Sequence, residues 1–204
     1  MSRTATSFVL GYHGCSEEVG RKAVVDGVPL RQSDEDFDWL GPGTYFWEGD
    51  PRRALEWAEQ KAVRKRIDKP FVIGAVIDLG NCFDLLQRDN IELLRVVHRN
   101  FTTLREKAGL PTPVNKDPKP INKGDKLLRF LDCAVIRHVH TMIADAAINP
   151  PGPEHFEPFD TVRGLFVEGK RAYKGGGFFE KTHTQIAVRT EACIKGVFIP
   201  RNLA

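Results

Sequence analysis

Three short segments carry the residues with the most chemical potential, and each lies at the edge of a predicted strand. They are Gly11-Tyr12-His13-Gly14, the run Gly41 to Trp47 followed by Trp57 on the next helix, and Thr182 to Val188. A histidine can exchange a proton near neutral pH, and an aromatic ring can hold a cation against its face. An amide such as Gln185 can accept a hydrogen bond, but it carries no charge and cannot act as a general base.

Common catalytic and metal-binding signatures do not occur in the sequence. No G-x-G-x-x-G follows a strand, and there is no P-loop, H-E-x-x-H or G-x-S-x-G. His138 and His140 point to different faces of a predicted helix, so we do not expect them to share a metal ion. The cysteines are scattered singly, which favours buried, reduced thiols without a metal: Cys15, Cys82, Cys133 and Cys193.

The order of the three segments points to a family. A His-Gly pair, then G-x-Y-F, then an acidic or amide residue that opens a late strand resembles the ADP-ribosyltransferase fold family, closest to its diphtheria-toxin and poly(ADP-ribose) polymerase branch. The resemblance spans residues 8 to 199. It implies an α+β fold with a split antiparallel sheet core and flanking helices. It also implies an NAD-dependent enzyme that transfers single ADP-ribose units to a macromolecule and releases nicotinamide.

The resemblance assigns a role to each matching residue. His13 would bond a ribose hydroxyl of the adenosine half of NAD, and the backbone of Gly14 would hold the nicotinamide carboxamide. Tyr45 would stack on the nicotinamide ring, and Trp57 would form a second aromatic wall. The residues themselves also allow plainer roles: His13 as a turn cap, and Tyr45 and Trp57 as core residues.

Gln185 departs from the family pattern, which usually has a glutamate there. Cleavage of NAD builds positive charge on the ribose, and loss of a stabilising charge typically costs about 2.7–4 kcal/mol of barrier. We therefore expect the substitution to reduce NAD affinity less than the rate of NAD cleavage. Because side chains alternate along a strand, His183 shares a face with Gln185, and the resemblance implies that His183 positions or deprotonates the acceptor. Glu180 is a second candidate for that role.

Other functions remain open at this stage. Hydrolysis of NAD by water and a silent NAD or ADP-ribose-binding module both fit the same residues. An RNA 2′-phosphotransferase would need a basic cluster, for which four residues are candidates: Arg163, Lys170, Arg171 and Lys174. The acceptor could be protein, nucleic acid or a small molecule, and the small size permits a toxin with a neutralising partner protein.

Composition limits the class of protein. The chain has 204 residues, of which 41% are hydrophobic and 28% charged, which predicts a single globular domain over residues 1–204. A net charge of +3 is too small to indicate nucleic acid or an anionic membrane. No apolar run approaches the roughly 20 residues of a membrane helix, and no secretory signal is visible, so we expect a cytoplasmic protein without a membrane partner.

Periodicity and turn residues predict the elements that position these segments. Strands are expected at residues 7–12, 45–47, 71–79, 164–168, 184–189 and 193–199, and helices at 16–26, 50–66, 89–107 and 125–147. The first strand should end in a turn at His13-Gly14. Three loops are expected: an acidic one at 31–43 that folds over something, a Pro/Lys-rich one at about 109–124, and a glycine-rich one at 169–181 that projects from the sheet.

Overall fold

A computed structural model describes residues 8–117, 126–153 and 155–201. Its strands are β1 (Phe8–Ser16), β2 (Thr44–Glu48), β3 (Pro70–Asp78), β4 (Cys82–Asp84), β5 (Thr161–Phe166), β6 (His183–Val188) and β7 (Ile194–Phe198). Its α-helices are α1 (Glu17–Val25), α2 (Pro51–Val63), α3 (Arg88–Lys107) and α4 (Phe130–Ile148). A short 3-10 helix, η1 (Glu191–Cys193), precedes β7.

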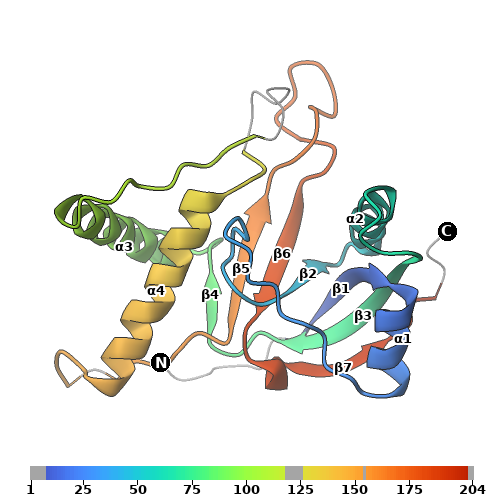
Figure 1. Cartoon of the computed structure of the whole chain (residues 1–204), viewed down its shortest axis with the longest axis horizontal. Coiled ribbons are helices and arrows are strands. Elements are labelled where there is room, and N and C mark those ends of the chain that lie inside the picture. The colour runs from blue at the N-terminus through green and yellow to red at the C-terminus, as the bar shows by residue number, and fades with distance from the viewer. Residues whose placement is uncertain (1–7, 118–125, 154, 202–204) are drawn as a thin grey trace.

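All seven strands join one sheet in the order β4-β5-β6-β2-β1-β3-β7 (Figure 1). The chain is therefore α+β, as the sequence predicts. The pairs of the central strands are antiparallel, whereas at one edge β4 pairs with β5 in parallel. β4 is not among the predicted strands, because its three residues are too few to show a period.

Local sequence explains where the first two helices begin. The hydroxyl of Ser16 accepts a hydrogen bond from the backbone nitrogen of Val19 and caps α1. Asp50 caps α2 through the nitrogen of Arg53, and Pro51 occupies the first helical position, where its missing N–H costs nothing.

Several predicted boundaries differ from the structure; α2, for example, ends at Val63 and not at residue 66. β1 continues through His13 and Gly14 to Ser16, because it pairs with the apolar strand β3 along its whole length, so the predicted His-Gly turn is wrong. α4 begins at Phe130, after a bridge between Lys116 and Leu128 that holds the chain in another conformation. β5 begins at residue 161 and not at 164.

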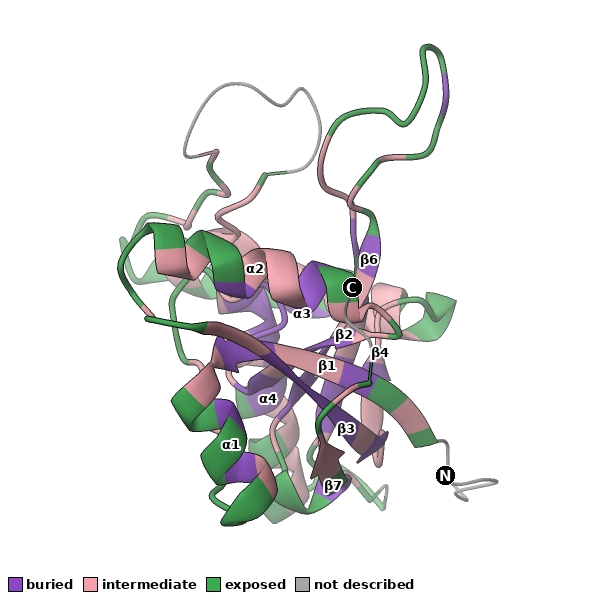
Figure 2. Cartoon of the chain, turned by 90° about the vertical axis from the view of Figure 1, so that its right-hand side faces the viewer, coloured by how far each residue is buried: buried purple, intermediate pink, exposed green. Residues whose placement is uncertain are grey.

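Helices cover both faces of the sheet. α2 crosses one face over β1 and β3, and α1 lies on the opposite face (Figure 2). α3 and α4 pack beside the part of the sheet that carries β4 (Figure 1). The main core cluster joins α3 and α4 to the sheet, and it includes Trp39, Leu40, Phe83, Val97, Val135, Ile136, Val139, Val162, Phe166 and Ala187.

The predicted loops have different outcomes. The connection between β5 and β6 projects from the sheet as expected (Figures 1 and 2). The Pro/Lys-rich loop is irregular up to residue 117, and its positions 118–124 lie outside the described residues. None of the four cysteines, all of which the structure describes, forms a disulfide; three are buried, as expected, and Cys82 is half-buried. Of the helices described, none has both the length and the apolar character to cross a membrane.

Candidate functional site

The three strands that carry the candidate residues are neighbours in the sheet, in the order β6, β2, β1. Trp47 of β2 lies opposite Gln185 on one side and Tyr12 on the other. Directly opposed residues point to the same face, so these three side chains form a row across the strands. Tyr45 and His183 lie two positions from members of that row and therefore share its face.

The pairing between β1 and β2 ends next to His13, where the two strands diverge. They are paired at only two positions, Gly11–Glu48 and Tyr12–Trp47, whereas β1 pairs with β3 at nine. At the opening, His13 Nδ1 lies 2.8 Å from the backbone oxygen of Tyr45. A carbonyl can only accept, so Nδ1 carries the proton. Within the described residues Nε2 makes no hydrogen bond.

His13 is set apart from the row on the neighbouring strands. Strand alternation turns its side chain to the face opposite Tyr12 and Gln185, and its ring packs 5.7 Å from that of Phe46. Burial lowers the pKa of His13, which keeps the ring neutral at physiological pH. The structure thus brings His13 to the opening between β1 and β2, but it does not bring His13 and Gln185 to one face.

Gly14 has a packing role in this structure. A Cβ at this position would collide with the backbone oxygen of Ala54 and lie 3.3 Å from the Cβ of Ala58. Both residues belong to α2. A close approach therefore requires glycine here, and the approaching group is the backbone of α2.

Tyr45 is held by the loop that precedes it. Its hydroxyl donates to the oxygen of Gly41 at 2.8 Å and accepts from the nitrogen of Leu40 at 3.1 Å. The ring packs against the main core cluster, and burial raises the pKa of the phenol well above its usual value. The plainer alternative, a core tyrosine with a satisfied hydroxyl, describes this geometry.

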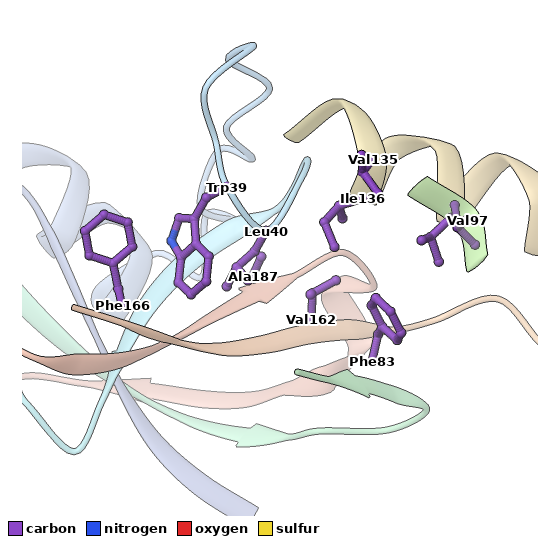
Figure 3. Packing of buried hydrophobic residues seen from close by; sticks show 10 residues of the cluster. Trp39, Leu40, Phe83, Val97, Val135, Ile136, Val162, Phe166 and Ala187 are labelled. Carbon is purple, nitrogen blue, oxygen red and sulfur yellow. The ribbon is translucent and has the colours of Figure 1, made fainter. Parts of the chain in front are cut away.

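Gln185 is bonded to a residue that sequence reasoning missed. Trp39 Nε1 donates to Gln185 Oε1 at 2.6 Å. Trp39 lies in the acidic loop and packs on Phe166, with ring centroids 5.2 Å apart (Figure 3). The loop therefore folds over Gln185, and an aromatic residue within an acidic, turn-rich stretch was the available signal. The amide keeps Nε2 as a donor without a partner among the described residues.

His183 is buried and neutral. Its Nδ1 donates to the backbone oxygen of Lys181 at 2.7 Å, and its ring stacks on Phe166 with centroids 5.5 Å apart. Burial lowers the pKa of His183. Its Nε2 is buried without a hydrogen-bond partner in the described part of the chain. The predicted shared face with Gln185 is correct, but that face is packed as well: His183 is only 6% exposed.

Trp57 lies beside Trp47, with ring centroids 5.5 Å apart. The Nζ of Lys61 already stands 3.5 Å from the centre of the Trp57 ring. A cation therefore occupies a face of the aromatic wall that the resemblance assigns to nicotinamide. Trp47 itself is 3% exposed and fills the space between Tyr12, Trp57 and His183.

Arg53 is another residue of this region that sequence reasoning missed. It is buried, lies over the ring of Trp47 and pairs with Glu168 at 2.6 Å. A buried arginine needs such a partner, because an uncompensated buried charge is strongly destabilising. This pair joins the first turn of α2 to the base of the projecting loop. Glu180 lies further out in that loop and is exposed.

Arg163 does not add an uncompensated charge to the basic cluster that a phosphotransferase would need. Arg163 is bonded to Glu48 at 2.7 Å and to Asp84 at 3.0 Å, so its charge is compensated within the sheet. The other three candidates, Lys170, Arg171 and Lys174, are exposed in the projecting loop.

No family model, curated protein or solved structure matches this chain. Among the residues that the structure describes, no group of three or more His, Cys, Asp and Glu side chains is arranged to hold a metal ion.

Proposed function

We propose that the protein is an NAD-dependent mono-ADP-ribosyltransferase whose site lies where β1, β2 and β6 adjoin, with His13 at the opening between β1 and β2 and with Tyr45 and Gln185 on the other face of the sheet. The observation that carries the proposal is the adjacency of the three strands. β1, β2 and β6 are neighbours, although the residues they contribute are far apart in the sequence. The sheet opens between β1 and β2 beside His13, whose Nε2 has no partner among the described residues.

The transfer needs a bond cleavage, an attack and a proton acceptor. The bond between C1′ of the ribose and the nicotinamide nitrogen breaks, and its electron pair stays on the nicotinamide. A lone pair of the acceptor then forms the new bond to C1′, and the acceptor releases its proton. His183 suits the last step, because its Nε2 lone pair is unprotonated and unengaged. Its burial means that the projecting loop has to move before an acceptor reaches it.

The expected rate of ADP-ribose transfer depends on Gln185. Its Oε1 is bonded to Trp39, and it brings no negative charge to the developing cation. Glu168, a nearby carboxylate, is engaged by Arg53. We therefore propose slow transfer of single units, with no polymer synthesis.

A catalytically silent NAD or ADP-ribose-binding module is the second candidate, and a specific observation favours it. The carbonyl of Gln185 already has a donor, and Trp47 fills the space next to it. Such packing suits a protein that only recognises NAD or ADP-ribose. It suits less well an enzyme that has to stabilise positive charge on the ribose.

Labelled NAD distinguishes these functions. We expect the purified chain, incubated with labelled NAD and a cell lysate, to transfer label to protein or nucleic acid. His183→Ala should lower transfer more than NAD affinity, and His138→Ala serves as the matched histidine control, since His138 bonds Asn100 on the surface.

Three other outcomes of this experiment would reject the transferase. Free ADP-ribose without a labelled acceptor would identify an NAD glycohydrolase. Saturable NAD binding without any product would identify a binding module, particularly if Gln185→Glu created activity that the parent chain lacks. A protein that neither binds nor cleaves NAD would refute both candidates.

A further inference from the structure

A cavity lies between α3 and α4. It has a volume of about 510 Å³, within the range of small-molecule sites. Its lining has an apolar part, which we call the floor, and a polar, mainly basic part, which we call the rim. The floor comprises Trp39, Leu85, Ile91, Leu94, Leu131, Val135 and Ile136, and the rim comprises Arg95, His98, Arg99, Arg129 and Asp132. We call this cavity the α3–α4 groove.

One stripe of α3 forms a wall of the groove. Its residues follow the spacing i, i+3, i+4, i+7 and i+8, so they lie on a single helix face: Ile91, Leu94, Arg95, His98 and Arg99. Along this stripe the character changes from apolar at the start to cationic at the end. The groove is therefore amphipathic along its length.

The rim has an excess of positive charge. Arg95 and Arg99 are one helical turn apart, where like charges repel, and neither forms an ion pair with any described residue. The rim's acidic residue, Asp132, is already engaged by Arg129 at 3.2 Å and by Asn115 at 2.9 Å. An anion placed between the two arginines would relieve their repulsion.

We propose that the α3–α4 groove binds a small anionic amphiphile, a carboxylate on an unbranched hydrocarbon chain. The chain lies on the apolar floor, where burial of each methylene is favourable. The carboxylate lies between Arg95 and Arg99, whose guanidinium groups match its geometry. Charge complementarity with the two arginines favours this occupant over a neutral or cationic one.

The groove also reaches the candidate site. Trp39 forms part of its floor, and the same indole donates a hydrogen bond to Gln185 through Nε1. A ligand that moves Trp39 therefore moves the amide. This consequence rests on the proposed function, whereas binding in the groove does not.

The test is calorimetric titration of the full chain with dodecanoate below its micelle concentration, without NAD. We expect saturable binding of one molecule, and binding at least about tenfold weaker in the exposed double variant Arg95→Ala/Arg99→Ala, because two charge-assisted contacts are lost. Arg88→Ala is the control, since Arg88 lies on the same helix outside the groove and pairs with Glu92. Dodecyltrimethylammonium, which has the same chain and the opposite charge, should not bind saturably.

Several outcomes overturn the proposal. They are no saturable binding of dodecanoate, equal affinity in the double variant, and equal binding of the cationic analogue. Binding of an acidic amphipathic peptide where dodecanoate fails would assign the groove to a protein partner instead. Because NAD is absent from the titration, failure here leaves the proposed function untouched, and failure of the NAD experiments leaves the groove untouched.

Discussion

The indole nitrogen of Trp39 and the side-chain oxygen of Gln185 lie 2.6 Å apart, although 146 positions separate them in the chain. This bond fastens the acidic loop onto β6. It also orients the amide, since the oxygen faces the indole and the NH₂ group is left to donate. Any ligand that meets Gln185 in this arrangement meets a donor, and an acceptor on the ligand suits it best.

A double-mutant cycle measures this bond. Trp39→Phe and Gln185→Leu each remove one partner, so we expect their losses of stability to be non-additive, with a coupling energy of about 1 kcal/mol. Urea unfolding of the two single variants and the double variant gives the value. Gln185→Leu combined with Arg88→Ala should be additive within about 0.5 kcal/mol. Additive losses in the first pair would show that the bond does not form in solution.

His13→Ala should remove the protection that NAD gives against thermal unfolding. Protection by a ligand at a hundred times its Kd is about 2.7 kcal/mol, which a melting curve detects easily. His155→Ala is the control, because the side chain of His155 is 83% exposed. Protection that persists in His13→Ala would exclude His13 from an NAD site.

Tyr45→Phe should lower stability without lowering NAD affinity. The buried hydroxyl bonds the backbone of Leu40 and Gly41, and loss of such a partner costs about 1–3 kcal/mol. Stacking on nicotinamide needs only the ring, so Tyr45→Ala should reduce both the stability of the fold and the affinity for NAD. Chemical unfolding and NAD titration measure them separately, with exposed Tyr173→Phe as the control. A loss of NAD affinity in Tyr45→Phe would assign the hydroxyl to the ligand.

Acid should destabilise the fold through His140. Burial lowers the pKa of His140 to about 3, while an unfolded chain has a value near 6.5. Between these values the unfolded chain binds a proton that the folded chain does not, so stability falls as the pH falls from 6.5 towards 3. The slope for this group is about 1.4 kcal/mol per pH unit.

Unfolding curves between pH 4 and 7 test this prediction. His140→Leu cannot take up the proton and should flatten the slope, whereas His155→Leu should leave it unchanged. His13 and His183, whose pKa values burial also lowers, add to the same trend in both variants. An unchanged slope in His140→Leu would contradict the burial of a neutral ring.

Features that depend on neighbouring residues were predictable from the sequence. Ser16 and the Asp50-Pro51 pair mark the helix starts, and the shared face of His183 and Gln185 follows from the period of a strand. The projecting loop follows from its glycines. Each of these depends on bonds and dihedral angles within a few positions of chain.

The tertiary structure decided the rest. β1 continues through His13 and Gly14 because β3 supplies its hydrogen bonds, and no local signal for a turn outweighs that pairing. The partners of Gln185 and Tyr45, and the α3–α4 groove, depend on which side chains of distant segments fill the same space. The sequence by itself thus determined the α+β class and the order of the candidate residues, while packing between distant segments decided which of their atoms are left free to act.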